Sequence, residues 1–107
     1  MAYAANVAEA WVYILRCRDG SLYTGWSSDL QRRLARHRAG RASRYTASRL
    51  PVELVLAVAM ADRTAAMREE ARIKSLDRSA KLALIGAQAD SVAGREGHGG
   101  VQAPLRA

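Results

Sequence analysis

Two short apolar segments joined by an Asp-Gly pair constrain the fold of this chain more than any other feature. Residues 11–15 (WVYIL) and 22–26 (LYTGW) are rich in β-branched and aromatic residues, which favour β-strands. Asp19 and Gly20 lie between them and are typical of a tight hairpin turn. We therefore expect two antiparallel strands connected by a short loop.

The length of this loop decides how the tyrosines of the two strands are arranged. A two-residue turn would place Tyr13 and Tyr23 on opposite faces of the sheet, because side chains alternate along a strand. A three-residue loop over residues 18–20, with Gly20 at positive φ, pairs Tyr13 with Gly25 and places both phenols on one face. We expect the three-residue loop, because only this register brings both phenols to the helix that follows. The same face then carries small residues around them: Ser21, Gly25 and Ser27.

The segment after the second strand predicts a helix and then a loop. Ser28 followed by Gln31 forms a capping box, and we expect the helix to run through Arg38 and to stop at Gly40. Residues 41–50 are polar and basic without a clear period, so we expect a basic loop there.

The rest of the chain predicts one more strand and two helices, which gives the order β-β-α-β-α-α. Pro51 introduces a mostly apolar run, residues 52–60, which we interpret as the third strand. The two helices are expected over residues 63–76, capped by Asp62, and from Ser79 through Ile85, ended by Gly86.

A chain of 107 residues has room for one domain, which we place at residues 10–88. Residues 1–9 lack periodicity and residues 89–107 are rich in glycine, so we expect both ends to be disordered. Cys17 is the only cysteine, which excludes an internal disulfide and a Cys-rich zinc site. There is no apolar run of about 18 residues and no leader-like N-terminus, so we expect a soluble cytoplasmic protein without a membrane partner.

The charge of the chain is +7, and fifteen of its seventeen basic residues are arginines. Such an excess predicts a polyanionic partner, unless the arginines form only a solvated surface. Residues 29–49 carry seven arginines against one acid: Arg32, Arg33, Arg36, Arg38, Arg41, Arg44 and Arg49.

Periodicity separates the basic residues of the first predicted helix into two groups. At 100° per residue, Arg33 and His37 flank the apolar stripe of this helix. Arg32 and Arg36 point away from it. An unpaired charge beside a core costs several kcal/mol, so we expect an anion to meet Arg33 and His37. The alternative is that Arg33 extends to water and His37 is hydrogen-bonded in the core.

Two adjacent carboxylates, Glu69 and Glu70, lie at the edges of the apolar face of the helix over residues 63–76. A divalent cation that acts on a phosphate needs such a group, because Mg²⁺ favours one or two carboxylates plus substrate oxygens. Periodicity does not choose between the two glutamates. Lys74, four residues after Glu70, is placed to form an ion pair with it.

The spacing of these residues resembles that of the GIY-YIG endonucleases. Residues 11–13 (WVY) and 23–25 (YTG) stand at the positions of the two family motifs, Arg33 follows Tyr23 by ten residues, and His37 follows Arg33 by four. The resemblance includes residues 44–46 (RYT) and 67–76 and covers about residues 10–86. It is closest to small single-domain bacterial members. Two departures, Trp11 for a glycine and Thr24 for an apolar residue, remove no reacting group.

The resemblance implies an α+β fold, a three-stranded antiparallel sheet flanked by three helices. It also implies a metal-dependent endonuclease that hydrolyses nucleic-acid phosphodiesters, with DNA favoured over RNA. Glu70 would hold Mg²⁺ or Mn²⁺ and Glu69 would be a bystander; no small-molecule cofactor is implied, and the oligomeric state stays open. The implied catalytic residues are Tyr13, Tyr23, Arg33, His37 and Glu70.

Roles follow from the chemistry of these groups. Tyr13 is our first choice as the general base, with its proton loosened by Arg33 or by a neighbouring lysine or arginine. Tyr23 would position the water or the phosphate, and the roles of the two tyrosines can be exchanged. His37 would orient Tyr13 or accept its proton. Tyr45 would contact a phosphate or stack on a base. The expected nucleic-acid-binding residues are Arg32, Arg36, Arg41, Arg44, Tyr45 and Arg49.

Two other classes of function fit the same charge. A non-catalytic nucleic-acid-binding module would use the basic helix and loop but would gain nothing from Glu70. A structural or interaction protein would carry the arginines only as surface charge and would show no salt-dependent nucleic-acid binding.

Overall fold

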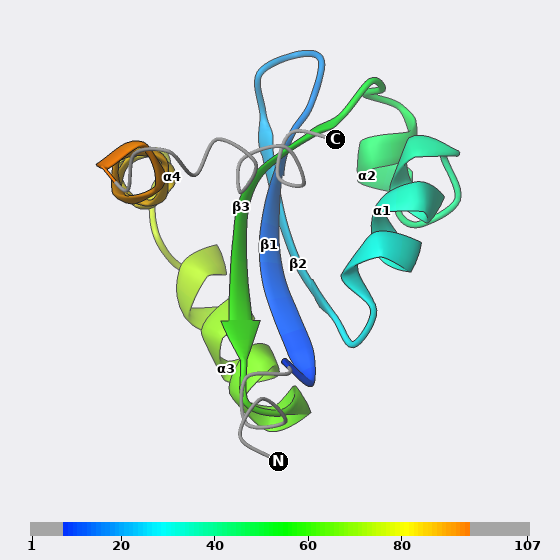
Figure 1. Cartoon of the computed structure of the whole chain (residues 1–107). Coiled ribbons are helices and arrows are strands. Elements are labelled where there is room, and N and C mark those ends of the chain that lie inside the picture. Colours follow the sequence, from blue (N-terminus) through cyan, green and yellow to red (C-terminus); the bar gives the residue numbers. More distant parts are fainter. Residues whose placement is uncertain (1–7, 95–107) are drawn as a thin grey trace.

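A three-stranded antiparallel sheet in the order β2-β1-β3 forms the centre of the protein in a computed structural model that describes residues 8–94. Helices α1 and α2 lie on one side of the sheet and α3 and α4 on the other (Figure 1). The predicted α+β fold and the order of its elements are confirmed, with one extra short helix. The elements are β1 (Ala10–Arg16), β2 (Leu22–Ser27), α1 (Leu30–Arg38), α2 (Arg44–Ala47), β3 (Glu53–Met60), α3 (Arg63–Lys74) and α4 (Arg78–Gly94).

The central strand β1 is covered on both faces, which explains why residues 12–15 are all apolar or aromatic. Val12 and Ile14 belong to a core that includes Ala66 and Ile73 of α3. Tyr13 and Leu15 belong to a second core, on the other face, that includes Leu30 and Leu34 of α1. The sheet therefore holds α1 and α3 apart and leaves the free edge of β2 between them.

The hairpin has the three-residue loop that we expected. Tyr13 pairs with Gly25 and Leu15 with Tyr23, so both phenols belong to one face. Gly20 has a φ of +87°, a backbone conformation that favours glycine. The register prediction is confirmed.

Helix α1 ends at Arg38 as predicted, but Asp29 rather than Ser28 caps its start. The Asp29 side chain accepts a hydrogen bond from the backbone N–H of Arg32. Ser27, the last residue of β2, fixes this arrangement because its hydroxyl accepts from the Asp29 N–H. The cap is therefore set one residue later than the capping-box pattern indicates.

The segment predicted to be a basic loop contains helix α2. Ser43 caps it, with its side-chain oxygen accepting from the Thr46 N–H. Thr46 is fully buried. Only one of the four residues of α2 is buried, so the sequence of this segment shows no helical period that would predict the helix.

Helix α3 begins after Asp62 as predicted, whereas both predicted ends of α4 are wrong. Asp77, not Ser79, bonds to the first turn of α4 through the Ala80 N–H. The helix continues past Gly86 to Gly94, so residues 89–94 are helical. A glycine inside a helix costs only about 1 kcal/mol relative to alanine, which explains why it does not end this one. The remaining parts of the predicted tails, residues 1–7 and 95–107, lie outside the described residues.

In the described part of the chain, none of the helices has both the length and the apolar character needed to cross a membrane.

Candidate active site

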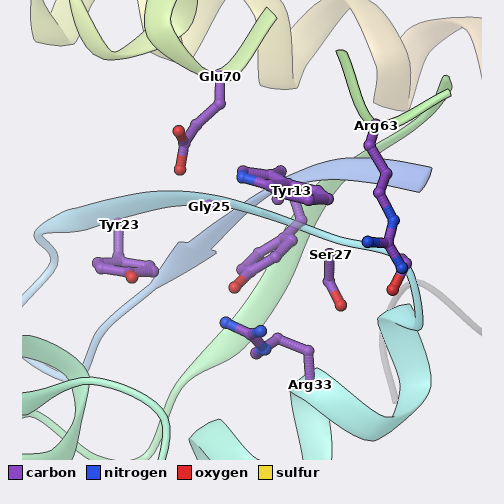
Figure 2. Close-up of a pocket in the computed structure, with 9 residues that line it drawn as sticks. Tyr13, Tyr23, Gly25, Ser27, Arg33, Arg63 and Glu70 are labelled. Atoms are coloured by element: carbon purple, nitrogen blue, oxygen red, sulfur yellow. The ribbon is translucent and has the colours of Figure 1, made fainter. Parts of the chain in front are cut away.

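A cavity of about 270 Å³ opens at the free edge of β2 and brings together side chains from both sides of the sheet. Figure 2 shows Arg33 of α1 and Glu70 of α3 on opposite sides of the β2 ribbon. Four of the five expected catalytic residues line the cavity: Tyr13, Tyr23, Arg33 and Glu70. The fifth, His37, is fully buried behind the tyrosines.

The glycine of the second motif makes room for the first tyrosine. A Cβ atom built on Gly25 would lie 2.6 Å from the Tyr13 hydroxyl oxygen and 2.7 Å from its ring carbon Cζ. Real atoms do not approach so closely, so the Tyr13 phenol can lie across β2 only if residue 25 has no side chain. This is the physical reason for a glycine opposite Tyr13.

A chain of hydrogen bonds runs from the cavity into the protein. The Tyr13 hydroxyl lies 2.8 Å from His37 Nε2, and His37 Nδ1 lies 2.9 Å from Thr46 Oγ1. The Thr46 hydroxyl donates to the Ser43 carbonyl oxygen at 3.4 Å, so it accepts from Nδ1–H of His37. That tautomer leaves Nε2 as an acceptor, and Tyr13 therefore donates its own proton to His37.

Burial keeps both members of this chain in their neutral forms. It raises the pKa of the Tyr13 phenol well above its usual value; Tyr23 adds to this, while the Arg33 guanidinium lowers the pKa by less. We expected Arg33 to loosen the Tyr13 proton. Arg33 does lower the pKa of Tyr13, but burial raises it by more. Burial, helped by the positive charge of Arg33, also lowers the pKa of His37 to about 4.

Charges on the open side of the cavity are less well paired. Arg33 is half-buried, and none of the ion pairs among the described residues involves it. Glu70 has a side chain that is 20% exposed and lies 3.4 Å from Lys74 Nζ, which is the ion pair expected at this spacing. An arginine without a carboxylate beside it favours an anion in the cavity.

Glu69 differs from its neighbour because it is fully engaged. Two nitrogens of Arg72 donate to its two oxygens at 2.9 and 2.7 Å, and these bonds hold the pKa of the Glu69 carboxyl below its usual range. Glu69 is not among the residues that line the cavity. Of the two glutamates, Glu70 is therefore the one that lines the cavity.

A divalent cation fits this site only together with a substrate. Within residues 8–94 there is no cluster of three or more His, Cys, Asp or Glu side chains that would bind a metal ion by itself. Mg²⁺ does not require such a cluster, because it retains waters and binds one or two carboxylates plus phosphate oxygens. The single carboxylate of Glu70 suits that coordination.

Aromatic rings continue from the cavity to the outer surface. The Tyr23 ring contacts His37 edge to face at 5.2 Å between centroids and stacks on Tyr45 at 6.1 Å. The Arg49 guanidinium covers the Tyr45 ring, with its central carbon 3.8 Å from the ring centroid. Tyr45 is therefore held between Tyr23 and Arg49 and supports the wall of the site.

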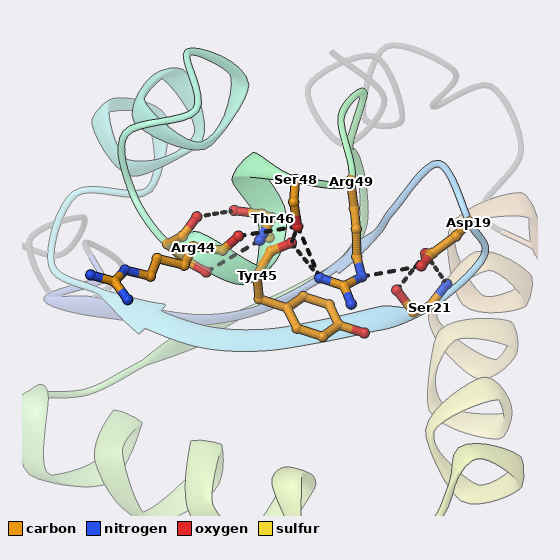
Figure 3. Close-up of polar contacts among 8 residues, drawn as sticks. Asp19, Ser21, Arg44, Tyr45, Thr46, Ser48 and Arg49 are labelled. Carbon is orange, nitrogen blue, oxygen red and sulfur yellow. Dashed lines mark hydrogen bonds and ion pairs between the residues drawn. The ribbon is translucent and has the colours of Figure 1, made fainter.

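Two of the arginines that we expected to bind nucleic acid form bonds within the protein. Arg49 donates to Asp19 at 3.1 Å and to the Tyr45 carbonyl oxygen at 3.0 Å (Figure 3). Arg36 donates to the Arg41 carbonyl oxygen at 3.1 Å. The other expected arginines, Arg32, Arg41 and Arg44, are exposed.

One arginine that lines the cavity was not among the residues expected from the sequence. Arg63 is the first residue of α3 and borders the same cavity as Arg33 and Glu70. It precedes Glu70 by seven residues, which is about two helical turns, so both project from one face of α3. That spacing was visible in the sequence.

The fold and this cavity define a small α+β domain whose site of tyrosines, an arginine and a glutamate lies at a sheet edge. The family model described as the GIY-YIG catalytic domain matches residues 9–83. The chain belongs to the GIY-YIG family.

Similar proteins occur in bacteria and archaea. The UPF0213 protein of Streptococcus sanguinis is 48% identical over 77 residues, which cover 72% of this chain and 88% of that protein. A UPF0213 protein of Natronomonas pharaonis is 45% identical over 78 residues, which cover 73% of this chain and 92% of that protein. The solution NMR structure of a UPF0213 protein from Bacillus halodurans has a TM-score of 0.50 and 41% identity, and covers 73% of this chain and 83% of that chain.

Proposed function

We propose that this protein is a metal-dependent endonuclease that hydrolyses nucleic-acid phosphodiester bonds, with DNA as the favoured substrate, in the cytoplasm. The observation that carries the proposal is the convergence of Arg33, Glu70 and two phenols on one cavity from four different elements. A cation, a carboxylate and weak acids around one position are the groups that phosphodiester hydrolysis needs.

Arg33 binds the scissile phosphate in this mechanism. Its guanidinium donates hydrogen bonds to non-bridging oxygens and stabilises the negative charge that increases in the transition state. Glu70 would hold Mg²⁺ or Mn²⁺, which when bound supplies Lewis-acid stabilisation of the same phosphate.

Tyr13 takes the proton of the attacking water. Its own proton already points to His37 Nε2, so the lone pairs of its oxygen can accept from a water and from the Arg33 guanidinium. Because burial raises the pKa of Tyr13, a phenolate formed in advance is disfavoured. The proton from water therefore moves to Tyr13 as the Tyr13 proton moves to His37. Because burial disfavours the His37 imidazolium as well, the proton returns through Tyr13 to the leaving oxygen as the bond from phosphorus to that oxygen breaks. Tyr23, half-buried at the cavity wall, positions the water or the phosphate.

A cleavage assay tests this function. The protein is incubated with duplex, single-stranded, flap and branched DNA and with RNA, in Mg²⁺ or Mn²⁺ and in chelator, and Glu70→Ala serves as the inactive control. We expect metal-dependent cleavage of at least one substrate and none by Glu70→Ala. Salt-dependent binding of these substrates without cleavage of any of them would instead support a non-catalytic binding module.

A further inference from the structure

Arg63 has no role in the proposed reaction, yet it occupies the same cavity. Figure 2 shows its guanidinium near the end of β2 with Ser27, on the far side of the cavity from Tyr23 and Glu70. Arg33 comes from α1 and Arg63 from α3, so the two arginines approach the β2 edge from opposite faces of the sheet. The cavity is thus basic at the Ser27 end.

The charge of Arg63 is unpaired in the part of the chain that the structure describes. Arg63 is exposed, and among the described residues it takes part in no ion pair and in no side-chain hydrogen bond. The adjacent acid, Asp62, is engaged as the cap of α3 and accepts from the Ala65 N–H at 2.8 Å. Two unpaired arginines beside one cavity repel each other, and anions bound beside them reduce that repulsion.

One phosphate does not account for both ends of this cavity. Arg63 and Glu70 project from the same face of α3 and are about 10 Å apart along its axis, at 1.5 Å per residue. In Figure 2 the Arg63 side chain also extends away from Glu70. A phosphate bound between Glu70 and Arg33 leaves Arg63 free for a second phosphate.

We propose that Arg63 binds a phosphate that neighbours the scissile one, so that the substrate strand follows the β2 edge from Tyr23 towards Ser27. This inference rests on the proposed function, because that function places the scissile phosphate at Arg33 and Glu70. It defines the substrate as a polynucleotide strand that continues past the cleavage position. A mononucleotide or a small phosphodiester offers no group to Arg63.

Binding of a short fluorescein-labelled DNA strand in Ca²⁺, followed by anisotropy, tests the contact. Arg63→Gln removes the charge, Arg63→Lys keeps it, and Arg68→Gln is the matched control because Arg68 is exposed on α3 and does not line the cavity. We expect Arg63→Gln to weaken binding about tenfold, as the loss of one charge-assisted hydrogen bond does. Arg63→Lys should recover part of this loss, and Arg68→Gln should change binding about twofold or less.

Replacing single phosphates of the strand by neutral methylphosphonates locates the contact. We expect one position, not the cleaved one, where the methylphosphonate weakens binding of the parent but not of Arg63→Gln. The inference would be overturned if, at every position, the methylphosphonate weakened binding of Arg63→Gln as much as binding of the parent. A loss of affinity in Arg68→Gln equal to that in Arg63→Gln would also overturn it. Cleavage in Mg²⁺ is measured separately. A further outcome is that the parent fails to cleave while one methylphosphonate position still weakens binding of the parent but not of Arg63→Gln. In that case the proposed function fails and the phosphate contact stands.

Discussion

The two sides of the candidate site satisfy their polar groups in opposite ways. On the inner side, Tyr13, His37 and Thr46 are fully buried, and their hydrogen bonds close within the protein. On the outer side, Arg33 and Arg63 have no ion-pair partner among the described residues. Buried groups that are satisfied hold a geometry, whereas charges left unpaired at a cavity are available to a ligand. Substitutions at His37 and Thr46 should therefore change mainly stability, and those on the outer side should change mainly activity. Substitutions at Tyr13, which also lines the cavity and is the proposed base, should change both.

The largest expected effect is on the outer side. Arg33→Ala should lower the single-turnover cleavage rate by at least about 10²-fold, as the removal of one electrostatic stabiliser does. Its free energy of unfolding should be unchanged or higher, because a half-buried arginine without a carboxylate is costly. Arg38→Ala, at an exposed arginine of the same helix that does not line the cavity, is the control and should retain the parent rate. A loss of stability in Arg33→Ala would break the contrast between the two sides.

On the inner side, acid should destabilise the protein through His37. The pKa of His37 is about 4 in the folded state and its usual value is 6.5, so between these values the unfolded state binds more protons. Stability therefore falls as the pH decreases from about 7 to about 4, by on the order of 2–3 kcal/mol, since one pKa unit corresponds to about 1.4 kcal/mol. Urea unfolding over this range, compared with His37→Gln, measures the contribution. The same pH slope in both proteins would show that His37 is not buried in its neutral form.

Two glycines should respond to alanine with opposite signs. Gly25→Ala places a methyl group against the Tyr13 phenol and should destabilise the protein by about 1–3 kcal/mol, as overpacking does. Gly86→Ala adds a methyl group in open space within α4 and should stabilise it by up to about 1 kcal/mol. Thermal unfolding of both variants measures the difference. A neutral Gly25→Ala would mean that Tyr13 has room to move.

The smallest expected effect separates a paired arginine from an unpaired one. Arg32 is exposed and its guanidinium is unbonded within the described residues, whereas Arg36 donates to the Arg41 carbonyl oxygen. Arg32→Gln should reduce the slope of log K against log salt for DNA binding by about 0.9, the value for one phosphate contact. Arg36→Gln should reduce it less. Equal slopes for the parent and Arg32→Gln would show that the basic face of α1 does not contact DNA.

Local patterns predicted residues on both sides of the site, His37 on the inner side and Arg33 on the outer side, and missed the helix that carries Thr46 and the position of Arg63. Turn chemistry at Gly20 sets the hairpin register, and helical periodicity places Arg33 and His37, because both are local properties. The position of Arg63 depends on how α3 packs against the edge of β2, which local patterns do not encode. The choice of Glu70 over Glu69 likewise came from the family resemblance and not from periodicity.

Single-turnover cleavage in Mg²⁺ by Glu70→Gln and Glu69→Gln tests the central claim most directly. These neighbours carry the same charge, but only Glu70 lines the cavity, while Glu69 is bonded to Arg72. We predict a loss of at least about 10²-fold in the rate for Glu70→Gln, a rate close to the parent's for Glu69→Gln, and equal or tighter DNA binding in chelator for Glu70→Gln. Equal losses in both variants, or no cleavage by the parent protein on any substrate, would contradict the account.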